Sequence, residues 1–252
     1  MISFDDPEAL AEATLSAARP LLVGLDVDGV LAPLVDHATD AALLDGMSDA
    51  MSAVADLDSV QVAVLSGRSL EGLAQFGFHH DLHVIGSHGM ETRDRPMDPL
   101  DDAEADRLAM LDALAEAAAH DAGDGAWVER KPASVVLHVR RADPDRGRTA
   151  LDDLAARARD VSGATAKPGS NVLELFARSA DKGTALVALG AELRAATILF
   201  AGDDVTDEDA FARLGPHDIA IKVGDAETIA PHRLRDPHAV LAFLHALATP
   251  QR

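Results

Sequence analysis

The stretch Leu21–Val30 reads LLVGLDVDGV: an apolar run leads directly into two aspartates, one residue apart, and a glycine. A short apolar run of this kind predicts a buried strand, and Gly29 permits a sharp turn behind it. Carboxyl ends of parallel strands open onto the ligand crevice, so Asp26 and Asp28 are expected there. Carboxylates this close repel unless a cation or a shared proton lies between them, which suits Mg²⁺ or coupled acid–base chemistry. The plain alternative is an Asp-Gly turn.

Short apolar runs and Ala/Leu-rich helical stretches alternate on both sides of this segment. Their order predicts an α/β fold whose core is a doubly wound, parallel, Rossmann-like sheet. The predicted strands are Leu21–Leu25, Val60–Leu65, His83–Ile85, Ile198–Ala201 and Ile219–Val223. The predicted helices are Pro7–Ala18, Thr39–Leu57, Ser69–Gln75, Gly183–Leu193, Thr206–Leu214 and Pro237–Ala248.

The middle of the chain breaks this alternation and predicts a smaller inserted α+β domain. Its pattern is helix–strand–strand, twice over: Asp101–His120, Trp127–Arg130 and Ser134–Arg140, then Pro144–Val161 behind Asp143 as N-cap, Gly163–Lys167 and Val172–Phe176. Polar stretches at 92–100 and 177–181 are the expected linkers. The predicted domains are therefore a core of residues 1–95 and 179–252 and an insertion of residues 96–178.

Composition narrows the possible functions. The chain has 252 residues, 48% of them hydrophobic, with 43 acidic against 22 basic residues and a formal charge of −21. Such an acidic surface disfavours nucleic acid and anionic membranes as partners. The absence of cysteine excludes disulfides, thiolate zinc sites and cysteine nucleophiles. Eleven histidines are scattered, and the pair His79-His80 shows no third ligand at a usual spacing, so no zinc site is predicted. We expect a cytoplasmic, monomeric protein.

A second acidic cluster follows another apolar run, in Ile198–Asp209 (ILFAGDDVTDED). Thr206 with Asp209 can be explained as a helix capping box. Asp203 and Asp204 abut the predicted strand end, where their charges are unfavourable without a metal, and hard oxygen ligands favour Mg²⁺.

Two further residues suit the same crevice. Ser66 follows a predicted strand and could donate to a phosphate oxygen, although an ordinary Ser N-cap also explains it. Lys182 stands at a helix start, where a cation opposes the helix dipole. A phosphate or the Asp26 carboxylate would account for that placement. A carboxylate nucleophile, a second carboxylate, Mg²⁺, a hydroxyl and a lysine are the groups that phosphoryl transfer needs.

The order of Asp26-x-Asp28-Gly29, Ser66-Gly67-Arg68, Lys182 and Gly202-Asp203-Asp204 resembles the haloacid dehalogenase superfamily of aspartate-nucleophile phosphatases. The segment 202–211 (GDDVTDEDAF) is similar to the signature of the trehalose-6-phosphate phosphatase family, and further similarity covers 21–247. The resemblance implies a Mg²⁺-dependent phosphatase that hydrolyses trehalose 6-phosphate, the last step of trehalose biosynthesis, and an inserted domain that acts as a cap.

The resemblance also implies a role for each matching residue. Asp26 would be the nucleophile and Asp28 the general acid and base, with Ser66 and Lys182 holding the phosphoryl group. Asp26, the Asp28 backbone carbonyl and Asp203 would hold Mg²⁺, with Asp204 and Asp207 in support. The sugar would be bound by Arg68 and His88 from the core and by cap residues Glu129, Lys131, Arg140 and Glu174.

Other interpretations stay open at this point. Val30 stands where the family commonly has Thr, which removes a hydroxyl from the nucleophile loop. The substrate could instead be sucrose phosphate or mannosyl-glycerate phosphate, or the chain could be a catalytically silent sugar-phosphate sensor. A response-regulator receiver domain also combines acids, a hydroxyl residue and Lys. In a receiver the paired acids come first and the Lys last, whereas here Lys182 precedes Asp203.

Overall fold

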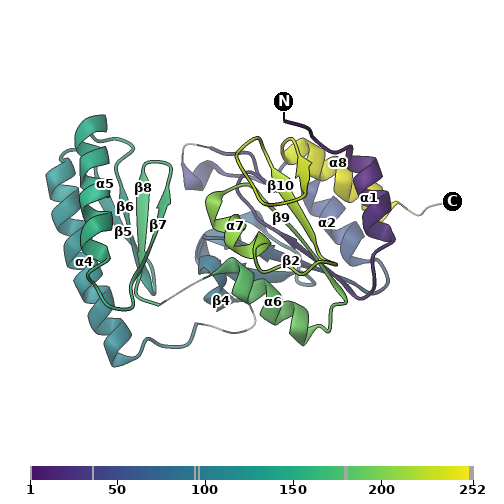
Figure 1. Cartoon of the computed structure of the whole chain (residues 1–252), viewed down its shortest axis with the longest axis horizontal. Helices are drawn as coiled ribbons and strands as arrows, with labels where there is room; N and C mark the ends of the chain where they lie inside the picture. Colours follow the sequence, from purple (N-terminus) through teal and green to yellow (C-terminus); the bar gives the residue numbers. More distant parts are fainter. Residues whose placement is uncertain (1, 36, 94, 96, 179–180, 250–252) are drawn as a thin grey trace. The chain divides into compact units, whose positions relative to one another are not determined.

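The chain folds as two compact units, Met1–Met97 with Asp181–Arg252, and Asp98–Ala180 (Figure 1). The structure is a computed structural model, which describes residues 2–35, 37–93, 95, 97–178 and 181–249. Within those ranges, no helix combines the length and the apolar character needed to cross a membrane.

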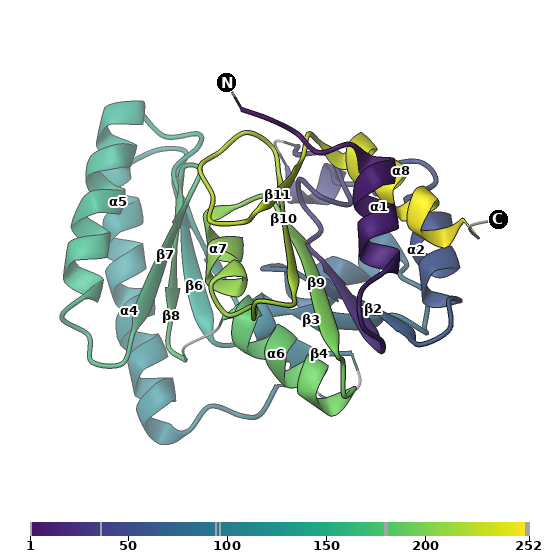
Figure 2. The same ribbon diagram turned by 45° about the vertical axis from the view of Figure 1, so that its right-hand side comes forward.

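The first unit is built on a seven-stranded sheet with the order β11-β10-β9-β1-β2-β3-β4. Figure 2 shows β9 and β10 of this sheet beside each other. Its strands are β1 Leu21–Leu25, β2 Val60–Leu65, β3 His83–Gly86, β4 Glu91–Thr92, β9 Thr197–Gly202, β10 Ile219–Val223 and β11 His232–Leu234. Every neighbouring pair is parallel except β3–β4. The prediction of an α/β fold with a mostly parallel sheet is confirmed. The short strands β4 and β11 were not predicted.

Helices cover both faces of this sheet, which is why β1 is buried along its whole length. Val23 and Leu25 pack with residues of α1 Pro7–Leu15, α2 Met47–Ala55 and α8 Pro237–Ala248. Leu22 faces the other way and packs with α6 Lys182–Glu192 and α7 Val205–Phe211. The strand's alternation thus divides the hydrophobic core into two layers. The remaining helical segments are α3 Leu70–Leu73 and the 3₁₀ turns Ala38–Asp40, Ala74–Phe76 and Ser87–Gly89.

One long helix of the sequence analysis is wrong. Residues Thr39–Leu57 do not form a single helix: a 3₁₀ turn at Ala38–Asp40 precedes α2, which begins only at Met47. Gly46 directly before α2 has a φ of 85°, a left-handed conformation that cannot continue a helix. The hydrophobic spacing of the segment was compatible with a helix, but the glycine interrupts it.

The second unit is a four-stranded antiparallel sheet, β5-β6-β8-β7, with two helices packed on one face. Its elements are α4 Asp102–Ala122, β5 Trp127–Arg130, β6 Ser134–His138, α5 Pro144–Ala158, β7 Thr165–Gly169 and β8 Val172–Phe176. Asp143 caps α5 as predicted, accepting hydrogen bonds from the backbone N–H groups of Asp145 and Arg146. Val135 and Leu137 face the helices, so by strand alternation Val136 and His138 face the other way.

Candidate active site

The site lies at the carboxyl ends of three adjacent parallel strands. Asp26 follows β1, Ser66 follows β2, and Asp203 follows β9. The register pairs Leu25 of β1 with Val64 of β2 and with Ala201 of β9. Because the three strands run the same way and end level with one another, residues from distant parts of the sequence meet at one edge of the sheet.

Lys182 joins two carboxylates at the centre of the site. Its ammonium nitrogen lies 2.9 Å from Asp26 Oδ1 and 2.8 Å from Asp207 Oδ1. Lys182 is 2% exposed, Asp26 5% and Asp207 not at all. Asp181 caps α6 by accepting from the N–H groups of Gly183 and Thr184, so the local helix start is stabilised independently of the lysine. The two ion pairs supply the reason for a cation at this helix start.

Asp26, Asp203 and Asp207 each offer an oxygen, and these oxygens lie within 4.8 Å of one another. Both oxygens of Asp207 already accept hydrogen bonds from the chain itself: Oδ1 accepts from Lys182, and Oδ2 accepts from the backbone N–H groups of Asp203 and Asp204, both at 3.0 Å. Asp26 and Asp203 are therefore the carboxylates best able to take a cation. Asp207 instead holds the loop that carries Asp203.

The capping prediction for this loop needs correction. The capping box of α7 is formed by Asp204 as N-cap with Asp207, and not by Thr206 with Asp209. The helix begins earlier than expected, at Val205. Asp207 thus has two uses, because the carboxylate that satisfies the helix N-terminus also pairs with Lys182.

The acidic groups of the site are costly to ionise without a cation. Burial raises the pKa of Asp26 well above its usual value, and the neighbouring charges of Asp207 and Asp203 raise it further, while Lys182 lowers it. Burial, with Asp207 and Asp204, raises the pKa of Asp203 to about 7. A further buried cation, Lys222, contacts the Asp204 carbonyl at 3.4 Å and Glu208 at 3.5 Å. Lys222 was not predicted as a site residue from the sequence.

The loop after β1 approaches Asp203 so closely that only glycine fits. Gly29 has a φ of 78°, and a Cβ there would lie 2.1 Å from Asp203 Oδ2. The Asp-x-Asp-Gly motif therefore does more than turn the chain, because its glycine leaves room for the carboxylate of the neighbouring strand end.

Asp28 is held by Arg68 in a bidentate pair. Arg68 Nε donates to Asp28 Oδ2 and Nη2 donates to Oδ1, each at 2.7 Å, and Nη1 donates to the Ala38 carbonyl at 2.8 Å. Arg68 was expected to bind sugar. In the structure its guanidinium fixes the plane of the Asp28 carboxyl group.

Ser66 is buried and sits in a tightly bonded turn. Its hydroxyl accepts from the Arg68 N–H at 3.1 Å, and its carbonyl accepts from the His88 N–H at 2.9 Å. The N-cap of α3 is Ser69 and not Ser66, so the N-cap explanation of Ser66 is wrong. His88 is buried with a φ of 54°, and its ring lies against Gly67, where a Cβ would come within 2.6 Å of Nε2.

Glu91, which the sequence analysis did not assign, braces the same turn. One of its oxygens accepts from the Ser87 hydroxyl at 2.8 Å and from the Leu70 N–H at 2.9 Å. It belongs to the short strand β4, whose two residues are too few to give a readable pattern. Only its place in the segment 86–91 (GSHGME) could have drawn attention to it.

In the second unit, the expected sugar ligands lie on or beside the sheet. Glu174 accepts from the Lys131 ammonium at 3.0 Å and from the Ser134 hydroxyl at 2.6 Å. Glu129 lies 2.8 Å from His138 Nε2, and this hydrogen bond lowers the pKa of Glu129. Arg140 follows β6 by two residues and is exposed.

Two aromatic rings support this arrangement and were missed from the sequence. The Trp127 ring stacks on His138 with centroids 4.4 Å apart and planes 1° apart. The register pairs Trp127 with His138 across β5 and β6 and puts Glu129 two residues further along the same face. Trp127, His138 and Glu129 therefore form a connected row. A lone Trp at a strand start carried no signal, because its partner is eleven residues away.

Comparison with known proteins agrees with this geometry. The trehalose-phosphatase family matches residues 24–237. The chain is 34% identical to the trehalose-phosphate phosphatase of Mycobacterium marinum, over 93% of this chain and 63% of that one. It is 35% identical to an uncharacterized glycosyl hydrolase of Mycobacterium tuberculosis, over 93% of this chain but 18% of that protein. The chain thus spans less than two thirds of the length of these relatives.

The solved structures show the same fold. The C-terminal domain of the trehalose-6-phosphate phosphatase of Candida albicans superimposes with a TM-score of 0.80 at 21% identity, covering 96% of each chain. The mostly parallel sheet and the separate antiparallel unit also match the fold of a haloacid dehalogenase-like hydrolase of B. subtilis, with a TM-score of 0.64 at 16% identity. Within that class, the extent of the family match decides the assignment. The chain belongs to the trehalose-phosphatase family.

Proposed function

We propose that this protein is a divalent-cation-dependent phosphatase that hydrolyses trehalose 6-phosphate to trehalose and phosphate through an aspartyl-phosphate on Asp26. The observation that carries the proposal is the buried Asp26–Lys182 pair beside Asp203, at the strand ends of a chain that belongs to the trehalose-phosphatase family. A nucleophilic carboxylate next to a fixed cation, in a buried setting, is suited to phosphoryl transfer.

The residues present fit a magnesium ion. Carboxylate oxygens of Asp26 and Asp203 lie close enough to share one cation, and the pKa of each group is raised by burial and by neighbouring carboxylates. Both observations favour a small hard cation with oxygen ligands. Asp26, the backbone carbonyl of Asp28 and Asp203 would hold it. When bound, Mg²⁺ would neutralise the charge of the transferring phosphoryl group.

The chain's own residues account for the remaining chemistry. An oxygen of Asp26 attacks phosphorus while the bond from phosphorus to the sugar oxygen breaks. Asp28, two residues on, protonates the departing oxygen and then takes a proton from the water that cleaves the aspartyl-phosphate. Lys182 and Ser66 hold the phosphoryl oxygens, and Arg68 orients Asp28.

The polar face of the second unit would recognise the sugar. Glu129, Lys131, Arg140 and Glu174 place carboxylates and cations on one antiparallel sheet or directly beyond it. A disaccharide presents many hydroxyl groups and little apolar surface, so charged hydrogen-bonding groups suit it. We therefore propose that the inserted unit, predicted from the sequence to span residues 96–178, is a cap that recognises the sugar of the substrate.

Phosphate release from a panel of phosphorylated sugars tests this function. Trehalose 6-phosphate should be preferred in kcat/KM by roughly tenfold or more over sucrose phosphate, mannosyl-glycerate phosphate and glucose 6-phosphate. Chelation should abolish activity, and added Mg²⁺ should restore it. Preference for another member of the panel would reassign the substrate while keeping the reaction.

Asp26→Asn is the decisive variant for the reaction itself. We expect it to lose roughly 10³-fold or more in kcat, because an amide cannot act as the nucleophile. The matched control Asp49→Asn changes an exposed aspartate on α2 and should leave activity unchanged. If wild type turns over no faster than Asp26→Asn in Mg²⁺, the protein is a sensor and not an enzyme.

A further inference from the structure

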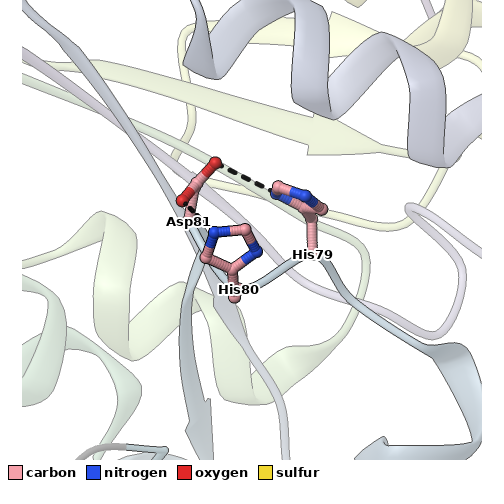
Figure 3. A group of neighbouring side chains, drawn as sticks. All are labelled: His79, His80 and Asp81. Atoms are coloured by element: carbon pink, nitrogen blue, oxygen red, sulfur yellow. Dashed lines mark ion pairs between the residues drawn. The ribbon is translucent and has the colours of Figure 1, made fainter.

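A second group of metal-ligating side chains lies away from the acidic site, in the turn before β3. His79, His80 and Asp81 are consecutive, and Figure 3 shows both imidazoles beside the Asp81 carboxylate. β3 is parallel to β2 and β1, so the amino end of β3 lies on the side of the sheet where these strands begin. Ser66 and Asp26 lie on the opposite side, where β2 and β1 end. The group is therefore separate from the proposed catalytic machinery.

The ligand atoms of the three residues lie close enough together to be drawn around one metal ion. His79 Nδ1 lies 3.1 Å from Asp81 Oδ2, and His80 Nε2 lies 3.0 Å from Asp81 Oδ1. One ligand atom from each of the three residues fits within a 4.8 Å limit. With zinc–ligand bonds of about 2.0–2.1 Å, two ligands of a tetrahedral ion lie about 3.3 Å apart. Small side-chain adjustments would therefore suffice to close the three atoms around one ion.

The backbone that carries the three residues is already ordered. Phe78 and Leu82, on either side, are buried in the core cluster that contains β1 and β2. The Leu82 N–H donates to the His79 carbonyl at 3.2 Å and closes the turn. Arg93 donates to the carbonyls of Phe78, His79 and Leu82. The turn is therefore already ordered in the folded chain, so a metal would bind without a further loss of backbone conformational entropy. This favours metal affinity.

We propose that His79, His80 and Asp81 bind one borderline transition-metal ion of the Zn²⁺ class, with solvent completing its coordination. Two imidazole nitrogens and one carboxylate suit Zn²⁺, Ni²⁺ or Cu²⁺, whereas Mg²⁺ selects oxygen ligands. All three side chains are exposed, between 50% and 81%, so the ion enters without any opening of the fold. The two metal sites of the protein would therefore accept different ions.

This site changes one conclusion from the sequence. A histidine pair without a third ligand at a usual spacing predicted no zinc site. Asp81 supplies the third ligand, because the turn directs side chains that are adjacent in sequence toward one point (Figure 3). In a helix or a strand, the side chains of adjacent residues point in different directions. Only the turn conformation therefore lets the three consecutive side chains lie close enough to bind one ion.

Isothermal titration with Zn²⁺, at pH about 7.5 and in saturating Mg²⁺, tests the proposal; neutral imidazole is the metal-binding form. Mg²⁺ competes with Zn²⁺ for the acidic site, and the same titration of Asp203→Asn identifies any Zn²⁺ that binds there instead of at the histidine site. We expect one Zn²⁺ per chain, and a loss of affinity of roughly tenfold or more in each of His79→Ala, His80→Ala and Asp81→Ala. Zn²⁺ should also raise the Tm of wild type, because it binds the folded chain preferentially.

His120→Ala is the matched control. His120 is also exposed and also lies beside a carboxylate, Asp121 at 3.7 Å, but within the described part of the chain it belongs to no group of three potential metal ligands. Zinc affinity should be unchanged in this variant. Circular dichroism and phosphatase activity should match wild type in all four variants, since none of these residues belongs to the acidic site or the proposed sugar face.

Either of two results would overturn the proposal. Wild type that takes up no stoichiometric Zn²⁺ would show that the two contacts are ion pairs only. Zinc binding that survives the double variant His79→Ala/His80→Ala would place the ion elsewhere. Both results are independent of the proposed activity, which the phosphate-release assay measures.

Discussion

At the scale of single residues, the ammonium group of Lys182 forms ion pairs with two carboxylates. One is Asp26, the proposed nucleophile, and the other is Asp207, which holds the loop that carries Asp203. Lys182 is buried between Asp26 and Asp207, so three charges share a region with almost no water. Burying a charge is costly unless it is paired, and removing one partner leaves the others uncompensated. The same ion pairs that position the proposed nucleophile therefore also affect stability.

Lys182→Met should remove both effects, since Met fills similar space without a charge. We expect a large loss of phosphatase activity and a loss of about 3–5 kcal/mol in the free energy of unfolding in metal-free buffer. Urea unfolding and kcat measure the two effects. Lys131→Met is the comparison: it breaks the pair with Glu174 in the other unit and should raise KM for the sugar phosphate with a smaller loss of stability. Equal stability losses would contradict this account.

Asp203 predicts an unusual dependence of stability on pH. Its pKa is raised to about 7 from 3.8, so the folded chain holds this proton more tightly than the unfolded chain does. Metal-free protein should therefore be stabilised by the protonated group at low pH and lose that stability as pH rises from about 4 to about 7. Unfolding by urea in chelator across this range measures it.

Asp203→Asn should weaken this pH dependence, because the amide carries no charge, while the raised pKa of Asp26 still contributes to it. Metal-free variant should exceed wild type in stability above about pH 7 by about 1–2 kcal/mol, a discounted figure since the site is shared with Asp26. Saturating Mg²⁺ should favour wild type instead. Asp225→Asn, an exposed aspartate, is the control. A variant less stable than wild type in chelator at about pH 8 would sink the repulsion argument.

At the scale of elements, the carboxyl ends of β1, β2 and β9 converge because these three strands are neighbours and parallel. The turn after each strand adds at least one candidate functional group, and Gly29 lets the turn after β1 lie close to Asp203. In the second unit, the antiparallel strands β5 and β6 also bring side chains from separate positions together. They line up Trp127, His138 and Glu129 by cross-strand contact.

Trp127→Ala tests whether that row positions Glu129. Loss of the stacking partner should free His138 and loosen Glu129, raising KM for trehalose 6-phosphate about fivefold, the equivalent of about 1 kcal/mol. Turnover of a small phosphate ester that lacks the disaccharide should not change. Met110→Ala, an exposed apolar residue on α4, controls for surface truncation. Parallel losses on both substrates would point to general unfolding of the unit.

At the scale of the whole molecule, the net charge of −21 opposes an anionic substrate. The cations proposed to meet substrate, such as Lys182 and Arg140, have to act locally against a long-range repulsive field. Salt screens charges that are far apart more strongly than charges in close contact. Added salt should therefore weaken the long-range repulsion of the substrate more than it weakens the contacts between bound substrate and nearby cations.

Raising ionic strength at fixed free Mg²⁺ should therefore increase kcat/KM for trehalose 6-phosphate modestly. The range from about 0.01 to about 0.1 M shortens the screening length from about 30 to about 10 Å, which removes most of the repulsion from distant carboxylates. Steady-state kinetics in a neutral-buffer salt series measures this. A steady fall in kcat/KM with salt would show that local cations dominate the approach of the substrate.

Much of the fold follows from patterns that are local in the sequence. Apolar runs predict β1, β2, β8 and β10 to the residue, and Asp143 before Pro144 predicts the start of α5. These features depend on burial and on backbone groups within a few positions. The failure at Thr39–Leu57 is also local, because hydrophobic spacing competes there with the left-handed Gly46.

What the sequence by itself determined is the set of candidate reactive groups and the strand ends that carry them: Asp26 and Asp28, Ser66, and Asp203. Only the tertiary structure decided their partners: Asp207 with Lys182, Arg68 with Asp28, and Trp127 with His138. Strand order and register bring residues tens of positions apart to within hydrogen-bonding distance, and neither is written in any short stretch of chain. The folded molecule therefore decides which carboxylates are available to a cation. It also decides which carboxylates accept hydrogen bonds from donors of the chain itself.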